Sequence, residues 1–158
     1  RPMRDGETDG VEYYFTTPEA LQRFSEEGKM IELRTYETVS GPWSYATVDD
    51  GQVDLENEDY LAIGTLISYE NMRNYYGEAH VIPLYIAVDD GVRLERALRR
   101  ERQQKKPNYA ELCRRFLADE ADFSRENLQR LGIEKAYENE DFEECVLQLN
   151  NTISYTEP

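Results

Sequence analysis

Cysteine and histidine are scarce in this chain of 158 residues, and long apolar runs are absent. No stretch approaches the roughly 18 to 20 apolar residues of a membrane-spanning helix, and no secretory signal pattern is present. The two cysteines, Cys113 and Cys145, lie far apart without a CxxC pair or a nearby histidine. They are therefore predicted to be buried thiols rather than a disulfide or a metal site. A cytoplasmic protein is expected.

Basic residues are also few. Eighteen lysines and arginines stand against 33 acidic residues, and the net charge is −15. This surplus of negative charge disfavours binding to nucleic acids or anionic membranes. The cations are unevenly distributed, since half of them fall between residues 93 and 115. Such a local concentration of arginine suits a small polyphosphate better than a polymer.

Strand-like and helix-like segments alternate, which is typical of an α/β domain, and the length suffices for one with a core. Residues 60–66 and 81–88 are continuous apolar runs, as expected for parallel strands buried on both faces. Residues 30–36 and 43–48 alternate in polarity and predict a hairpin. Further short strands are predicted at 11–15 and 132–138.

Helix boundaries are predicted from caps and stop residues. Thr17 and Pro18 are expected to open a helix that Gly28 ends. Asp141 is expected to cap the last helix. The remaining predicted helices are 68–77 with Ser68 as its cap, an arginine-rich helix from Asp89-Asp90-Gly91 to Pro107, 109–123, and 142–153.

The opening residues form a candidate anion clamp. Arg1 and Arg4 lead into a glycine-containing loop, and Tyr13 follows it. A guanidinium presents a planar fork of donors to phosphate oxygens, and a tyrosine hydroxyl adds one more donor. The segment therefore suits a phosphomonoester. A solvated loop that enters a strand is the alternative.

The same segment resembles the guanylate kinases, which transfer a phosphoryl group from ATP to GMP. The matching residues are Arg1, Pro2, Arg4, Gly6, Glu7, Asp9, Gly10, Tyr13 and Phe15. The similarity weakens further along but persists to the end of the chain. It implies an α/β fold with a P-loop NTPase-type three-layer parallel-sheet core, a small, mostly β lobe for the nucleoside monophosphate, and a helical lid.

The resemblance also implies a division of the chain. Residues 1–50 would form the nucleoside-monophosphate-binding lobe and residues 51–92 the first part of the core. Residues 93–119 would form the arginine-rich lid. Residues 120–158 would complete the core and add the C-terminal helix.

The glycine loop GxxxxGK[ST], which holds the donor phosphates in this class, does not occur in the sequence. The only Gly-Lys pair, Gly28-Lys29, lacks the upstream glycine. We expect the first strand and the P-loop to be missing through loss of an N-terminal piece, so that the chain as given is inactive. An intentional fragment and a natural pseudokinase are the alternatives.

The acceptor site is implied residue by residue. The residues that would bind GMP are Arg1, Arg4, Tyr13, Glu32, Tyr45 and Thr47. Among these, Glu32 and Thr47 would contact the guanine, and the others the phosphate. Where the family carries Asp-x-Asp, this chain has Gly64-Thr65-Leu66. GMP or dGMP is therefore the first expected ligand, and another purine monophosphate the second.

The donor side is implied by the lid. Arg100, Arg102 and Arg115 would be catalytic by stabilising charge on the transferring phosphoryl group. Arg99 and Asn139 would contact ATP. Mg²⁺ is expected to arrive with ATP, without identifiable ligands among the side chains. The alternative for this segment is a solvated helix with Glu–Arg pairs.

A second hypothesis is a catalytically silent guanylate-kinase-like module that binds a phosphorylated ligand or peptide. The acceptor residues suit both hypotheses. Loss of the aspartates favours the binding module, whereas the lid arginines favour the kinase.

Overall fold

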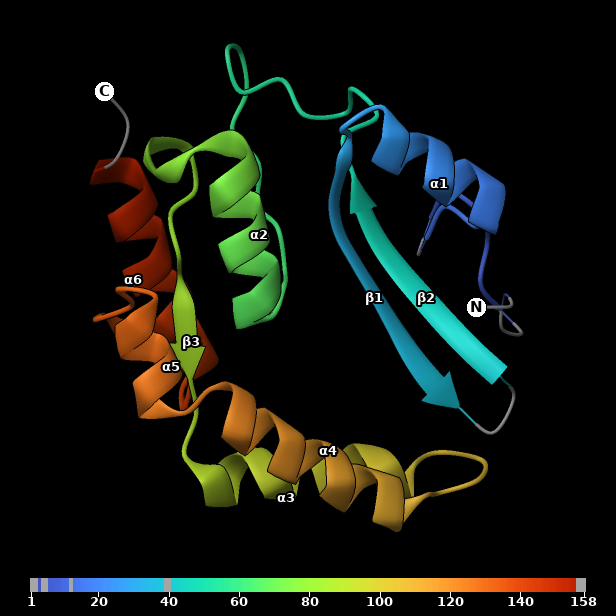
Figure 1. The fold of residues 1–158 in the computed structure, drawn as a ribbon. Coiled ribbons are helices and arrows are strands. Elements are labelled where there is room, and N and C mark those ends of the chain that lie inside the picture. The colour runs from blue at the N-terminus through green and yellow to red at the C-terminus, as the bar shows by residue number, and fades with distance from the viewer. Residues whose placement is uncertain (1–2, 4–5, 12, 39–40, 156–158) are drawn as a thin grey trace. The chain divides into compact units, whose positions relative to one another are not determined.

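The computed structural model describes residues 3, 6–11, 13–38 and 41–155. The chain divides into two compact units, Arg1–Val81 and Ile82–Pro158 (Figure 1). Helices are combined with two small sheets, one antiparallel and one parallel, each of two strands. The α/β class predicted from the sequence is therefore confirmed. None of the helices in the described ranges has the length and apolar character that a membrane span requires.

Helix α1 (Pro18–Glu26) begins and ends as its sequence predicts. Thr17 Oγ1 accepts a hydrogen bond from the backbone N–H of Ala20 at 3.3 Å, which satisfies one of the free N–H groups of the first turn. At the other end, Gly28 has a φ of +72°. This left-handed conformation lets Lys29 N donate to Phe24 O at 2.8 Å, a Schellman ending.

Strands β1 (Met30–Thr38) and β2 (Gly41–Val48) form the predicted antiparallel hairpin. In its register Glu32 lies opposite Thr47, and Arg34 lies opposite Tyr45. Directly opposite residues of an antiparallel pair project from the same face of the sheet. The ladder therefore gathers these four side chains on one face, although they come from two strands.

Helix α2 (Leu66–Tyr76) and the 3₁₀ turn η1 (Glu78–His80) complete the described part of the first unit. Thr65 rather than Ser68 caps α2, since Thr65 Oγ1 accepts from Ser68 N at 3.4 Å. The strand predicted at 60–66 is wrong. Residues 60–65 pair with no described strand, and the side chain of Ile63 is fully exposed.

The second unit holds the parallel pair β3 (Tyr85–Ala87) and β4 (Ala136–Glu138). Each is shorter than the segment predicted for it, 81–88 and 132–138 respectively. Its helices are α3 (Asp90–Arg102), α4 (Tyr109–Asp122), α5 (Arg125–Arg130) and α6 (Phe142–Tyr155). The short helix α5 was not predicted. Side chains buried in this unit are Leu131, Ile133, Tyr137 and Cys145.

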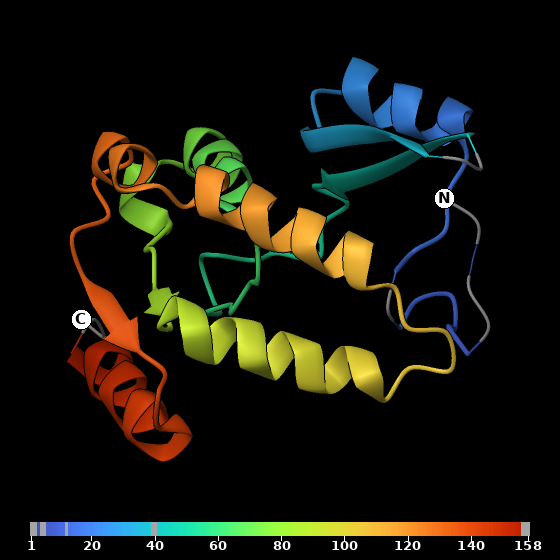
Figure 2. The same cartoon turned by 90° about the horizontal axis from the view of Figure 1, so that it is seen from below.

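Local capping explains the helices of this unit. Asp89 Oδ1 accepts from Gly91 N at 2.9 Å and from Val92 N at 3.2 Å, so α3 starts directly after β3. Asp141 Oδ1 accepts from Glu144 N at 3.0 Å, which confirms the predicted cap of α6. Helices α3 and α4 run side by side in opposite directions as a helical hairpin (Figure 2).

Two further expectations are wrong. The strand predicted at 11–15 is one of them: among its described residues, Tyr13 forms an isolated bridge with Asp9 outside any named strand, and Asp9 Oδ1 accepts from Phe15 N at 2.6 Å. Cys113 is exposed on α4, whereas Cys145 is buried as predicted. A helix exposes one side to water, and position 113 falls on that side of α4.

We predict that Thr17→Ala lowers the free energy of unfolding by about 1 kcal/mol, because the N-cap hydrogen bond of α1 is lost. Urea denaturation followed by circular dichroism measures the change. Thr16→Ala is the matched control, since the exposed Thr16 precedes the cap and starts no helix. Equal losses in both variants would contradict the capping role.

Candidate functional site

A pocket of about 590 Å³ lies in the first unit. It is lined by α1, by β2 and by residues 13–16, and three of the predicted acceptor residues lie on it: Tyr13, Tyr45 and Thr47. The rings of Tyr13 and Tyr45 meet edge to face with centroids 5.9 Å apart, and Tyr36 contacts Tyr45 in the same way at 6.0 Å. Such contacts fix the ring of Tyr45 between two neighbours. Arg1 and Arg4 lie outside the described residues.

Glu32 does not line this pocket. Its side chain is only 5% exposed and belongs to a cluster formed with Arg34, Thr65 and Ser68, which we call the Glu32 cluster. Arg34 Nε lies 2.7 Å from Glu32 Oε1, an ion pair without the alignment of a hydrogen bond. Ser68 Oγ donates to Glu32 Oε2 at 2.9 Å. Oε2 therefore accepts a hydrogen bond within the protein, whereas Oε1 lies beside the guanidinium without accepting one.

Arg34 also joins the hairpin to the start of α2. Its Nη1 donates to Thr65 Oγ1 at 3.2 Å and its Nη2 to Ser68 Oγ at 3.3 Å. The sequence analysis did not identify Arg34, and it named Ser68 only as a helix cap. The spacing of Glu32 and Arg34 was a usable signal, because residues two apart in a strand share a face. Ser68, 36 residues from Glu32, gave no such signal.

Gly64 shows why a family-like aspartate does not fit at this position. A Cβ atom on Gly64 would lie 2.8 Å from the Cβ of Ser68, which is closer than real Cβ contacts allow. Ser68 is itself buried at the start of α2 and bonded to Glu32. A carboxylate at position 64 would therefore require the N-terminus of α2 to shift.

The predicted lid arginines lie in the helical hairpin of the second unit. Arg99, Arg100 and Arg102 occupy the last turn of α3. Arg99 Nη2 lies 3.2 Å from Glu95 Oε1. Arg100 and Arg102 are exposed, and neither forms an ion pair with any residue that the structure describes. Both residues are therefore exposed to solvent in the described structure.

Arg115, on α4, is already paired. Its Nε donates to Glu111 Oε1 at 2.8 Å, and Arg114 binds both oxygens of the same carboxylate at 2.8 Å. The hydrogen bonds from Arg114 and then Arg115 lower the pKa of Glu111 to about 2. A ligand that recruits Arg115 must compete with this carboxylate for the guanidinium.

Asn139 follows β4 directly, at the carboxyl end of the parallel pair. Its backbone N–H donates to Ala87 O at 2.8 Å. Arg96 donates to the carbonyl oxygens of Asn139 at 2.8 Å and of Glu140 at 2.9 Å. Arg96, which the sequence analysis did not single out, therefore ties α3 to the end of β4 and holds the predicted ATP contact in place.

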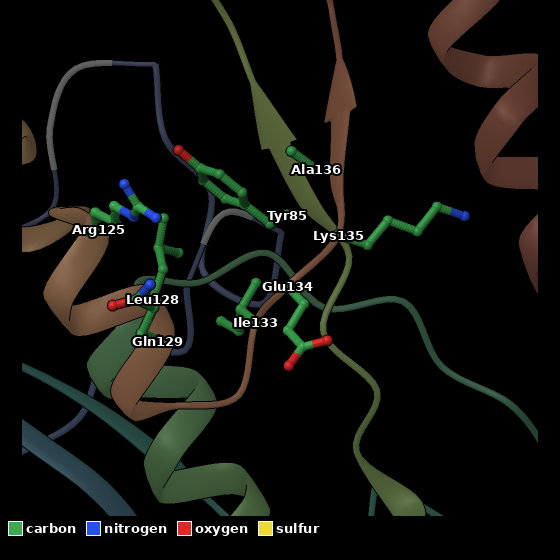
Figure 3. A pocket seen from close by; sticks show the side chains of 8 residues that line it. All are labelled: Tyr85, Arg125, Leu128, Gln129, Ile133, Glu134, Lys135 and Ala136. Carbon is green, nitrogen blue, oxygen red and sulfur yellow. The ribbon is translucent and has the colours of Figure 1, made fainter.

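A second pocket, of about 530 Å³, lies beside β4 and α5 and contains none of the predicted site residues (Figure 3). Arg125 and Gln129 of α5 border it together with Tyr85 of β3. Lys135 borders it as well, but its ammonium group lies over the ring of Tyr137 and donates to Thr152 Oγ1 at 3.0 Å. Figure 3 shows this lysine pointing away from the other lining side chains.

Comparison with protein-family models and with curated proteins found no match to this chain. Its chemistry is therefore inferred from its residues. Within the described ranges, no three side chains of His, Cys, Asp or Glu are grouped closely enough to hold a metal ion. A metal that accompanies a nucleotide takes its ligands largely from phosphate oxygens and water.

We predict that the ion pairs of Glu111 stabilise α4 at neutral pH and lose their effect as pH falls from 4.5 to about 2. The sign follows from the pKa, because a carboxyl whose pKa is lowered on folding stabilises the folded state only while it is ionised. Urea denaturation at a series of pH values should show a weaker acid dependence in Glu111→Gln than in the wild type.

Glu56→Gln is the matched control, because Glu56 is an exposed loop carboxylate. Its acid dependence should follow that of the wild type. A Glu111→Gln curve parallel to the wild-type curve over this range would contradict the assignment.

Proposed function

We propose that this chain is a divergent guanylate kinase-like protein whose first unit binds a purine nucleoside monophosphate, with GMP or dGMP as the first candidate. One observation carries the proposal. Tyr13, Tyr45 and Thr47, which the resemblance assigns to the acceptor, line one pocket although more than 30 residues separate the first from the others. A chance resemblance confined to sequence gives no reason for this convergence.

The chemistry of the pocket suits a phosphomonoester. The hydroxyl groups of Tyr13 and Tyr45 supply neutral donors, and the edge-to-face contact between their rings limits their motion. Arg1 and Arg4 would add guanidinium donors and neutralise the phosphate charge. In a protein of net charge −15, binding an anion requires such local cations.

The proposal extends to the second unit. A P-loop NTPase-type three-layer core is proposed around the parallel pair β3–β4, because α3 begins at the carboxyl end of β3, and Asn139 follows β4 at the same edge. Open α/β sheets bind nucleotides at this edge. The exposed Arg100 and Arg102 are proposed to face the phosphates of ATP.

Phosphoryl transfer needs more than these residues. The string GxxxxGK[ST] does not occur among the 158 residues, so transfer is proposed only for a molecule in which such a loop is supplied. Mg²⁺ is proposed to arrive with ATP, and the proposal assigns the ion to no residue. Arg115 would have to exchange Glu111 for the nucleotide.

A silent binding module for a phosphorylated ligand or peptide is the second candidate. The observation that favours it is the Glu32 cluster, in which the carboxylate assigned to guanine is already paired with Arg34 and Ser68. The tight packing at Gly64, which leaves no room for an aspartate, points the same way. Neither the pairing of Glu32 nor the packing at Gly64 involves Tyr13 or Tyr45, the proposed phosphate contacts.

Calorimetric titration of the 158-residue chain with GMP, dGMP, inorganic phosphate and a phosphoserine peptide distinguishes the two candidates. The kinase-like proposal expects binding of GMP and dGMP that is tighter than binding of inorganic phosphate. Preference for the peptide would support the silent module. Absence of heat with every nucleotide would exclude the acceptor site.

We predict that Tyr45→Phe weakens GMP binding about tenfold, because one hydrogen bond to the phosphate, worth roughly 1.4 kcal/mol, is lost. Calorimetry gives the dissociation constant. Tyr36→Phe is the matched control, since Tyr36 packs against Tyr45 without lining the pocket. A loss of affinity in Tyr36→Phe as large as in Tyr45→Phe would show that packing, rather than the hydroxyl, decides binding.

A further inference from the structure

We propose that Asp50 is a specificity-determining residue of the pocket in the first unit, because its carboxylate binds the donor edge of guanine and so selects GMP over AMP. The resemblance to the guanylate kinases assigns no role to this position and gives base recognition to Glu32 and Thr47. The inference rests on the proposed function, since it concerns the base of the monophosphate whose phosphate is assigned to Tyr13 and Tyr45.

Asp50 lines the pocket of about 590 Å³, whereas Glu32 does not. Strand β2 contributes its residues from Tyr45 to Val48 to the same lining, and Asp50 follows the end of the strand by two residues. Tyr45 and Val48 are about 10 Å apart along an extended strand. Tyr45 and Asp50 therefore occupy separate places along the pocket, as the phosphate and the base do in a nucleoside monophosphate.

The carboxylate of Asp50 retains acceptor capacity. Its Oδ1 accepts from the backbone N–H of Gln52 at 3.3 Å, and within the described residues its Oδ2 has no hydrogen-bond partner and the exposed side chain forms no ion pair. The neighbouring Asp49 differs, because its Oδ1 accepts from Gly51 N at 3.2 Å and its Oδ2 from the hydroxyl of Tyr75 at 3.0 Å. Of these two adjacent aspartates, Asp49 therefore serves the fold and Asp50 is available to a ligand.

A carboxylate in a pocket for a phosphomonoester needs donors on the ligand, because it repels the phosphate charge. Guanine has such donors on one edge, where N1–H and the N2 amino group match the two oxygens of a carboxylate. Adenine presents its N6 amino group beside N1, which is an acceptor. The lone pairs of N1 and of Asp50 would face each other, so AMP is disfavoured.

Gln52 supplies the complementary group. Its side chain also lines the pocket, and its backbone N–H is the donor that holds Asp50 Oδ1. A side-chain amide carries an NH₂ donor, which the O6 atom of guanine accepts. Gly51, between the two, has a φ of +89°, in the left-handed region that favours glycine. This turn after β2 therefore carries an acceptor for the N–H groups of guanine and a donor for its carbonyl within three residues.

The test compares GMP, IMP and AMP on the wild-type chain and on Asp50→Asn by calorimetric titration. The wild type should bind GMP about tenfold or more tighter than AMP, the effect of one hydrogen bond. IMP keeps N1–H but lacks the N2 amino group, so it should fall between them. In Asp50→Asn, the preference for GMP over AMP should fall by about tenfold, because an amide can pair with both N6 and N1 of adenine.

Asp59→Asn is the matched control. Asp59 is an exposed loop carboxylate that does not line the pocket, and the variant makes the same change of charge and shape. Its ratios of affinity should equal those of the wild type. Removing a negative charge also weakens repulsion of the phosphate, but this acts on GMP and AMP alike. The GMP-to-AMP ratio therefore separates base recognition from net charge, and circular dichroism checks that each variant is folded.

A ratio that Asp50→Asn leaves unchanged overturns the inference, since guanine is then recognised by another group. Equal binding of the three nucleotides by the wild type overturns it as well, while the proposed monophosphate site stands. If the folded wild type binds none of the three, the proposed function itself fails, and the inference fails with it.

Discussion

A carboxylate that is buried away from water needs a partner of opposite charge and hydrogen-bond donors. In the first unit, the contacts that satisfy one such carboxylate also connect strand β1 to helix α2. This carboxylate belongs to Glu32, which contacts Arg34 on the same strand and Ser68 on α2. The contact fixes the start of α2 against β1.

The two units differ in how they present their candidate anion-binding groups. In the first unit, tyrosine rings pack against one another around a pocket, and their hydroxyls are placed by that packing. In the second unit, guanidinium groups stand on the outside of a helical hairpin, some paired with carboxylates and others unpaired within the described residues. The first group is held by ring packing, whereas Arg100 and Arg102 form no ion pair within the described residues.

Sequence predicted well where the signal was local. The cap at Thr17, the hairpin of alternating residues and the cap at Asp141 were all recoverable, because each depends on neighbours within a few positions. The strand predicted at 60–66 failed because an apolar run records hydrophobicity, whereas a strand also needs a paired neighbour. The pairing of Glu32 was hidden for a related reason, since one partner lies 36 residues away.

The division into two units has a practical consequence for spectroscopy. The single tryptophan, Trp43, lies in β2 of the first unit, whereas Cys113 and Cys145 both lie in the second, one exposed and one buried. Indole emission therefore reports on one unit, and the delayed reaction of the buried thiol reports on the other. If both signals change in the same unfolding transition, the two units unfold cooperatively. If the signals change in separate transitions, each unit unfolds independently of the other.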